Sequence, residues 1–301
     1  MLPIIFGLSG ETLANQEISL LNDNKIWGII LFSRNIKSKS QTINLTTEIK
    51  KQSKNPNIHI LIDEEGGRIT RLKEIYPLPL KAAAELGKEL EKNHAEGKQE
   101  IIKTYTEIAN RLKSLGINIA CSPVADLTMP ETHDIIGDRS FSKNIDTVIQ
   151  ATKIAADTLL NNNILPTIKH IPGHGRATMD SHLELPKITT EIDILENTDF
   201  RIFKNLNNYP LAMTAHIIYD ALDPKTPITL SPHSISYIRN NIGYKGKIMT
   251  DDIGMKALQS YSLKEIISFA LQAKCDYILH CNGDINEMTE IIDILGHNAT
   301  N

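Results

Sequence analysis

Eight short apolar runs, spread along 301 residues, constrain the fold of this chain more than any other feature. The runs hold four to six residues each, mostly aliphatic, with little alternation of polar and apolar side chains. Such runs are typical of strands that are buried on both faces of a parallel sheet. We therefore expect strands at residues 4–7, 27–32, 59–63, 117–121, 166–169, 211–214, 247–250 and 277–280.

Amphipathic stretches between these runs carry helix start signals. A Ser followed three residues later by Gln or Glu predicts a capping box, and Ser before Pro predicts a capped first turn. The signals are Ser38 with Gln41, Ser262 with Glu265, and Ser231 before Pro232. Apolar residues at steps of three and four predict a helix over residues 146–160. Residues 80–115 predict one long helix or two, with Gly97 as the break.

Eight strand–helix units are the number that closes a (β/α)8 barrel. Without a linker or a shift in composition, we expect residues 1–301 to form a single barrel domain of the α/β class. An open doubly wound sheet is the structural alternative. It is disfavoured because the turn after the first run, Gly7–Gly10, lacks the glycine-rich dinucleotide-binding pattern.

Composition narrows the classes of partner. With a net charge of −4, the chain lacks the basic surface that nucleic acids or anionic membranes attract. Its three cysteines form no C-x-x-C pair, which fits a reducing compartment. We expect no leader, and no apolar run is long enough to span a membrane. We expect a cytoplasmic protein with a small-molecule substrate and no obligatory protein partner.

Polar residues follow six consecutive expected strands at the point where each ends. They are Asp63, Asp126, Lys169 with His170, His216, Asp251 with Asp252, and His280. Barrel enzymes build their active sites from the loops at the carboxyl ends of the strands. We therefore expect these side chains to meet at one rim.

Simpler interpretations exist for several of these groups. Glu64, Glu65 and Arg68 could form a solvated loop with a local ion pair. A lone histidine such as His216 is more often a satisfied core residue than a catalyst. The Asp251–Asp252 pair could cap a helix that begins near residue 255.

The segment 169–182 is harder to explain by structure alone. It holds His170, His174 and His182, and its Pro172 and two glycines prevent a regular helix or strand. The imidazoles must lie on a loop, which is where rigid scaffolds commonly carry catalytic groups.

Three chemistries compete for this loop. A metal site could use His170, His174 and His182, although the spacing matches no H-E-x-x-H pattern. A phosphate site could use Lys169, Arg71 and Arg139 as a clamp. Glycosyl transfer to water needs a carboxylate such as Asp251 and a proton donor such as His182, with Asp180 to orient the imidazole.

Three motifs carry a resemblance to a known family. They are Lys169-His170-x-Pro172-Gly173-His174-Gly175 followed by Asp180-Ser181-His182, the segment 62–68, and the segment 136–141. With these motifs, nearly the whole chain resembles the bacterial β-N-acetylhexosaminidases of glycoside hydrolase family 3. The similarity is to their short cytoplasmic type, which works in cell-wall recycling.

The resemblance implies a retaining hydrolase that removes terminal β-linked N-acetylglucosamine (GlcNAc) from peptidoglycan fragments. The expected substrates are GlcNAc-1,6-anhydroMurNAc muropeptides, without a metal or cofactor. It implies that Asp251 is the nucleophile and that His182, paired with Asp180, is the acid/base. It further implies that the sugar hydroxyls are held by Asp63, Arg71, Arg139, Lys169 and His170. A sugar-binding barrel without catalysis is the remaining alternative.

Three positions depart from the family pattern. Ile171 stands where Phe is usual, Thr250 where Ser is usual, and Arg176 where a small or acidic residue is more common. Arg176 matters most, because a long cation on this loop could change how the loop closes or what it contacts beyond GlcNAc. Neither the sequence nor the resemblance gives His174 a role.

Overall fold

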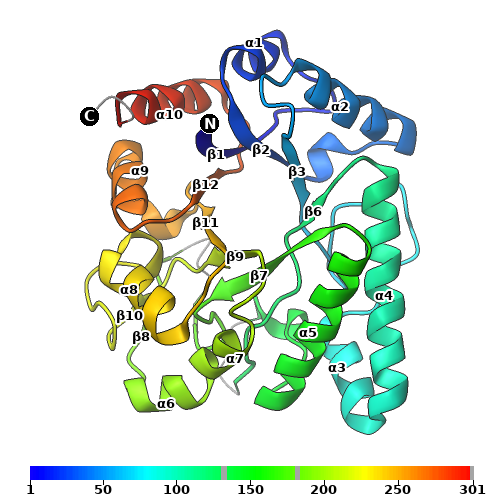
Figure 1. Cartoon of the computed structure of the whole chain (residues 1–301), viewed down its shortest axis with the longest axis vertical. Helices are drawn as coiled ribbons and strands as arrows, with labels where there is room; N and C mark the ends of the chain where they lie inside the picture. Colours follow the sequence, from blue (N-terminus) through cyan, green and yellow to red (C-terminus); the bar gives the residue numbers. More distant parts are fainter. Residues whose placement is uncertain (130–133, 180–183, 299–301) are drawn as a thin grey trace.

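The computed structural model describes residues 1–129, 134–179 and 184–298. Eight parallel strands close into a barrel in the order β1-β12-β11-β9-β7-β6-β3-β2 (Figure 1). Their bounds are β1 Leu2–Gly7, β2 Ile26–Leu31, β3 His59–Ile62, β6 Ile119–Ala120, β7 Leu165–Ile171, β9 Leu211–Thr214, β11 Lys247–Asp252 and β12 Tyr277–His280. Each expected run forms one of these strands, so the predicted (β/α)8 barrel is confirmed.

Helices lie around the outside of the strands (Figure 1). In the described ranges they are α1 Asn15–Asp23, α2 Lys39–Gln52, α3 Ala83–Lys92, α4 His94–Ser114, α5 Ile145–Asn161, α6 Ile192–Asn197, α7 Asp199–Asn205, α8 Pro232–Tyr237, α9 Leu263–Gln272 and α10 Ile285–Asn298. None of these helices is long and apolar enough to cross a membrane.

The apolar side chains divide into two cores because successive residues of a strand face opposite sides of the sheet. Ile4 and Phe6 of β1 pack outward against the helices, whereas Ile5 belongs to a smaller cluster inside the barrel. That inner cluster ends at the amino side of the strands, where Trp27 stacks on Tyr277 with ring centroids 3.9 Å apart. The opposite, carboxyl end of the barrel is left for polar side chains.

The predicted helix starts are found, one of them in altered form. Ser262 and Glu265 form the reciprocal capping box of α9, and Ser231 caps α8 with Pro232 in its first turn. The Ser38 side chain caps α2, but the Gln41 side chain accepts from the Lys37 backbone. The predicted stripe of α5 is buried, and its residues are Val148, Ala151, Thr152, Ala155 and Leu159.

The expected break at Gly97 is wrong. The chain breaks at Asn93, whose side chain accepts from the backbone N–H groups of residues 95 and 96 and so caps α4. Gly97 lies within α4, where an added Cβ would come 2.3 Å from the Leu90 backbone of α3. Glycine is therefore needed there for close helix packing and not to end a helix.

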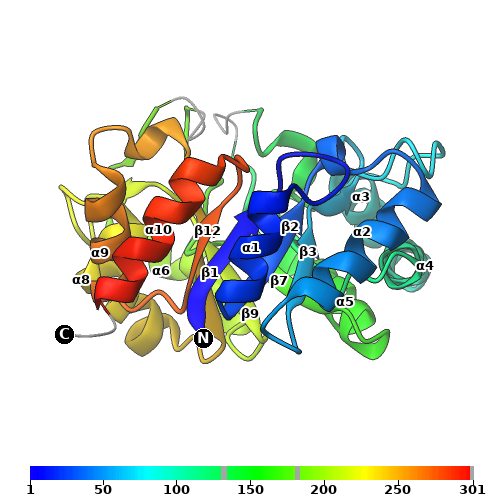
Figure 2. The same cartoon turned by 90° about the horizontal axis from the view of Figure 1, so that it is seen from above.

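Short elements after the strands build the walls of the carboxyl end. They are the hairpin β4 Glu64–Gly66 with β5 Ile69–Thr70, the 3-10 turn η2 Gly137–Arg139, and the pair β8 Lys187–Ile188 with β10 Ile218–Tyr219. Figure 2 shows the barrel from the side, with the amino end of β1 at the bottom and these connections toward the top.

Candidate active site

A cavity of about 380 Å³ lies at the carboxyl end of the barrel. Six of the eight predicted site residues line it: Asp63, Arg71, Arg139, Lys169, His170 and Asp251. The other two, His182 and Asp180, lie outside the described residues. The structure therefore brings together side chains that are separated by up to 188 positions in the sequence (251 − 63).

Lys169, at the end of β7, is the centre of a buried ion cluster. Its Nζ lies 2.8 Å from Oδ1 of Asp63 and 2.6 Å from Oε1 of Glu65, and its side chain is 3% exposed. Burial works against the charged ammonium, but the two carboxylates outweigh burial and raise the pKa of Lys169. Lys169 is therefore a fixed cation at neutral pH.

Glu65 joins Lys169 to the loop after β6. The Arg139 guanidinium binds it with two hydrogen bonds, Nε to Oε2 at 2.8 Å and Nη2 to Oε1 at 2.9 Å. Burial opposes the charge of Glu65, but Arg139 and Lys169 outweigh it and hold its pKa well below the usual range. Glu65 was not among the predicted site residues, yet it positions two of them.

Glu64 and Glu65 do not form the solvated loop that was one interpretation of this segment. Glu64 is buried and accepts from the Thr70 hydroxyl at 2.7 Å and from the Arg71 backbone N–H at 2.9 Å. Burial is the main reason why the pKa of Glu64 is raised. These bonds close the β4–β5 hairpin and place Arg71 beside Asp63, with Nη2 3.3 Å from Oδ2.

Arg68 fixes the opposite wall from the turn of the same hairpin. Its Nε donates to Oδ1 of Asp138 at 2.6 Å, and its Nη2 donates to the backbone carbonyls of residues 134–136. Arg139 also donates to the carbonyl of Ile135, which lines the cavity. The two arginines thus define where the loop after β6 meets the cavity.

His170 is held by Asp126, which was expected at this rim but was given no role in binding or catalysis. Nδ1 of His170 lies 2.7 Å from Oδ2 of Asp126, which is fully buried behind it. Oδ1 of Asp126 accepts from the backbone N–H of His170 at 3.2 Å and of His174 at 2.7 Å. One buried carboxylate therefore orients the His170 ring and ties down the start of the histidine loop.

His174 is buried and packs its ring edge-on against that of His170, with centroids 5.4 Å apart. Burial, followed by the neighbouring His170, lowers the pKa of His174 to about 4. His174 is therefore neutral at physiological pH. Its described contacts include the ring contact with His170 and the hydrogen bond from its backbone N–H to Asp126.

Asp251 lies at the cavity end of β11. Its backbone N–H is 3.3 Å from the Thr214 hydroxyl, and its Oδ1 accepts from the Asp252 backbone N–H at 2.8 Å. Asp252 instead accepts from the backbone of Gly254 and of Cys281, both at 3.0 Å. The helix-cap interpretation of this pair is wrong, because β11 extends through Asp252 and the next short turn begins at residue 256.

His216 and His280 are buried supports beside the site. Nδ1 of His216 lies 2.8 Å from the Thr229 hydroxyl, and its Nε2 lies 3.0 Å from the Asp252 carbonyl oxygen. Nε2 of His280 lies 2.7 Å from Glu287 of α10. The core interpretation of His216 is thus confirmed, and neither histidine lines the cavity.

Arg176 contacts protein and not the cavity. Its Nε donates to Oδ2 of the buried Asp199 at 2.6 Å, and its Nη2 donates to the Thr198 hydroxyl at 2.9 Å. Burial dominates at Asp199 and raises its pKa despite this ion pair. Arg176 thus anchors the loop to the α6–α7 junction, and its effect on loop closure stays a prediction.

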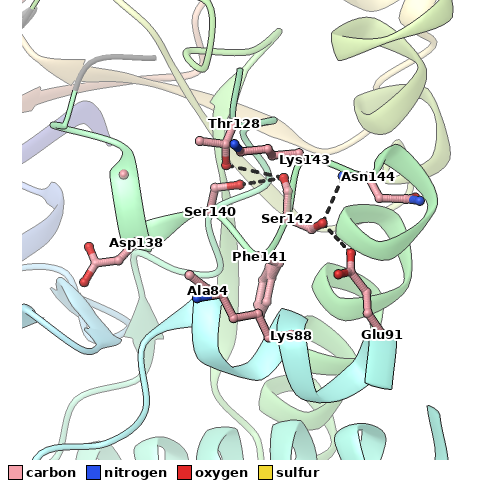
Figure 3. A pocket seen from close by; sticks show the side chains of 11 residues that line it. Ala84, Lys88, Glu91, Thr128, Asp138, Ser140, Phe141, Ser142, Lys143 and Asn144 are labelled. Atoms are coloured by element: carbon pink, nitrogen blue, oxygen red, sulfur yellow. Dashed lines mark hydrogen bonds between the residues drawn. The ribbon is translucent and has the colours of Figure 1, made fainter. Parts of the chain in front are cut away.

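A second hollow of about 670 Å³ lies beside the η2 wall, between α3 and the start of α5 (Figure 3). Its side chains bind one another: Ser142 donates to Glu91 and accepts from the Asn144 backbone. Asp138 borders it, while the next residue, Arg139, lines the first cavity. None of the predicted site residues in the described ranges lines this second hollow.

The cavity's charges bear on two of the competing chemistries. The clamp cations of the phosphate hypothesis, Lys169, Arg71 and Arg139, are each paired with a carboxylate, which weakens their attraction for an anion. The described residues contain no group of three metal-ligating side chains, and the third histidine of the metal hypothesis is His182. Fixed donors and acceptors beside the Asp251 carboxylate suit a ligand that carries many hydroxyl groups.

Comparison with known proteins gives one consistent result. Residues 7–299 match the family described as the glycosyl hydrolase family 3 N terminal domain. A beta-hexosaminidase of Alkalilimnicola ehrlichii is 34% identical over 284 residues, covering 93% of this chain and 80% of that protein. A beta-hexosaminidase of Neisseria gonorrhoeae is 34% identical over 289 residues, with coverages of 93% and 78%.

Solved structures agree with these relatives. NagZ from Neisseria gonorrhoeae in complex with N-trifluoroacetyl-D-glucosamine superposes with a TM-score of 0.88 at 31% identity, covering 97% of this chain and 84% of that one. A family 3 beta-N-acetylglucosaminidase from Paenibacillus superposes with a TM-score of 0.90 at 27% identity, with coverages of 97% and 56%.

Proposed function

The chain belongs to glycosyl hydrolase family 3, and from that premise we propose that it releases GlcNAc from peptidoglycan fragments by a two-step retaining mechanism. As its curated relatives are beta-hexosaminidases, its activity is that of a β-N-acetylhexosaminidase. The substrate, the catalytic residues and the mechanism are the proposal. The observation that carries it is that Asp251 lines the same cavity as Lys169 and His170.

In the first step, a carboxylate oxygen of Asp251 attacks the anomeric carbon. The glycosidic C–O bond breaks, its electron pair stays on the departing oxygen, and His182 gives that oxygen a proton. Asp180 accepts a hydrogen bond from the other ring nitrogen of His182 and stabilises the imidazolium before it acts. The product is a glycosyl ester of Asp251.

In the second step, neutral His182 takes a proton from water, and the water oxygen attacks the anomeric carbon. The ester bond breaks and returns Asp251 as a carboxylate. Two inversions give net retention. The contacts of Asp251 support this role, because the Asp252 backbone N–H holds one carboxylate oxygen in place during both steps.

We assign the sugar hydroxyls to the cluster of Asp63, Arg71, Arg139, Lys169 and His170. Their mutual ion pairs hold the side chains rigidly, so binding a sugar costs little ordering of the protein. Such preorganisation also places the anomeric carbon relative to Asp251.

We assign the aglycone to 1,6-anhydroMurNAc peptides, on the strength of the resemblance to cell-wall recycling hexosaminidases. Such fragments would reach the enzyme in the cytoplasm, and the three free, buried cysteines fit that reducing location. A comparison of kcat/KM for GlcNAc-anhydroMurNAc peptides and for chitobiose tests the assignment. A preference for chitobiose contradicts it.

The stereochemistry of the first product tests the two-step mechanism. Proton NMR of an aryl β-GlcNAc hydrolysis should show β-GlcNAc first and the α anomer only after mutarotation. The α anomer as first product contradicts a covalent intermediate. Asp251→Asn should lower kcat by roughly 10⁴-fold or more, whereas Asp146→Asn, a change at an exposed ion pair away from the cavity, should leave kcat unchanged.

A further inference from the structure

Asp126 is the buried carboxylate behind His170, and it does not line the cavity. Both of its oxygens are used. Oδ1 accepts from two backbone N–H groups, those of His170 and His174, and Oδ2 faces Nδ1 of His170 at 2.7 Å. An ionised carboxylate can only accept hydrogen bonds, so Nδ1 must be the donor in this contact.

The charge state of Asp126 supports that assignment. Burial alone would raise its pKa, but His170 and the hydrogen bonds from His170 outweigh burial and hold the pKa below the usual range. Asp126 is thus an acceptor at neutral pH.

The other ring nitrogen of His170 has a different surrounding. In the described part of the chain, the His170 ring contacts Asp126 through Nδ1 and packs against the ring of His174. His170 lines the cavity beside Lys169 and Asp251. We propose that Asp126 is a positioning residue that keeps the proton of neutral His170 on Nδ1 and presents Nε2 to the sugar as a hydrogen-bond acceptor.

An acceptor at this point changes what the wall can bind. The neighbouring cations, Lys169 and Arg139, can only donate hydrogen bonds. A sugar hydroxyl that donates to Nε2 of His170 can still accept from a cation, so both of its functions are satisfied. With the proton on Nε2 instead, the His170 ring can only donate at this point, and a sugar hydroxyl that donated to Nε2 loses that acceptor.

Asp126→Asn tests this positioning role, because the oxygen and the NH₂ group of the new amide are not equivalent. The amide oxygen must remain with the backbone N–H groups of His170 and His174, since an amide NH₂ cannot accept from them. The NH₂ then donates to Nδ1 of His170, and the proton of the neutral ring moves to Nε2. The variant keeps the size and the loop contacts of Asp126 but reverses the tautomer.

The direct measurement is ¹⁵N NMR of histidine-labelled protein, with His170→Ala to assign the signals. In the natural protein, the neutral His170 ring should carry its proton on Nδ1. In Asp126→Asn it should carry the proton on Nε2. A natural protein with the proton on Nε2 overturns the proposal, whatever the variant does. This measurement needs no substrate, so its failure is distinct from failure of the proposed function on which the kinetic role rests.

Kinetic measurements distinguish an effect of Asp126 through the His170 ring from an effect through the loop backbone alone. Asp126→Asn should lower kcat/KM for an aryl β-GlcNAc by about 10- to 100-fold, the equivalent of one or two hydrogen bonds to charged or polar groups. In the His170→Ala background the same change should cost less than about threefold, because coupled residues are non-additive. Equal losses in both backgrounds overturn the proposal.

Asp199→Asn is the matched control. Asp199 is also a buried aspartate that holds the histidine loop, through Arg176, but it does not contact His170. Its effect on kcat/KM should therefore be the same with and without His170→Ala.

Discussion

The ion cluster under the cavity gives a quantitative prediction that follows from counting its charges. Three cations, Lys169, Arg139 and Arg71, face two carboxylates, Asp63 and Glu65. Glu65→Gln leaves three cations against one carboxylate, with Arg139 and Lys169 both almost buried. Lys169→Met leaves two cations against two carboxylates. Lys169→Met should therefore leave a smaller uncompensated charge in the cluster than Glu65→Gln.

Removing one member of a buried ion pair costs about 3–5 kcal/mol, because the partner is left buried and uncompensated. We expect Glu65→Gln to lower the free energy of unfolding by that amount. Lys169→Met should cost only about 1–3 kcal/mol, since each carboxylate keeps an arginine and loses one charged hydrogen bond. Lys247→Met, at a lysine whose side chain is 59% exposed, is the control and should change stability by less than about 1 kcal/mol.

The assay is urea unfolding at pH 7, followed by circular dichroism and by fluorescence of Trp27, the only tryptophan, which stacks on Tyr277 inside the barrel. The pH dependence adds a second test. Because the folded-state pKa of Glu65 is lowered, its contribution is complete above about pH 4.5, its ordinary value, and is lost as the pH falls. The difference between natural protein and Glu65→Gln should shrink in acid. Equal costs for the two variants at pH 7, or a difference that grows in acid, refute the reasoning.

Three further predictions concern the histidine loop. Arg176→Ala leaves Asp199 buried without this cation, so the free energy of unfolding at pH 8, measured with urea, should fall by about 3 kcal/mol. The loss should be smaller at pH 5, because the raised pKa of Asp199 lets its carboxylate take up a proton. Gly175→Ala places a Cβ 1.7 Å from the Leu127 carbonyl oxygen, so the loop must move and kcat/KM should fall by about tenfold or more. His182→Ala should lower kcat by about 10²–10⁴-fold for substrates with poor leaving groups and far less for activated aryl glycosides.

Matched variants control for these changes. Arg201→Ala removes an exposed ion pair with Asp146 and should alter stability by less than about 1 kcal/mol. Gly10→Ala adds a methyl group where no atom lies within 4 Å, so activity should be unchanged. The account is contradicted if Arg176→Ala resembles Arg201→Ala, if Gly175→Ala keeps full activity, or if His182→Ala loses equally on both classes of substrate.

The barrel could be predicted because each buried strand is a short aliphatic run, a signal that does not depend on distant contacts. The α3–α4 boundary could not be placed from Gly97, because glycine serves both to end helices and to let them pack closely. Asn93 carried the correct signal as a capping residue.

The site was predictable where position along the chain carries meaning, since the carboxyl ends of the strands must meet. Glu65 and Asp126 were given no role in it, because their roles depend on partners 74 and 44 residues away, Arg139 and His170. Their positions after strands were visible in the sequence, but the pairing was not. The partner of Arg176, the buried Asp199, could not be foreseen for the same reason, because it is set by tertiary packing.

The central claim is that Asp251 forms a covalent bond to the sugar. A 5-fluoro GlcNAc fluoride, which slows the second step more than the first, tests it by intact-protein mass spectrometry and peptide mapping. The account predicts a mass increase of one fluorinated sugar per chain, located on Asp251 and absent in Asp251→Asn. Turnover without an adduct, or an adduct on another carboxylate such as Asp252, contradicts it.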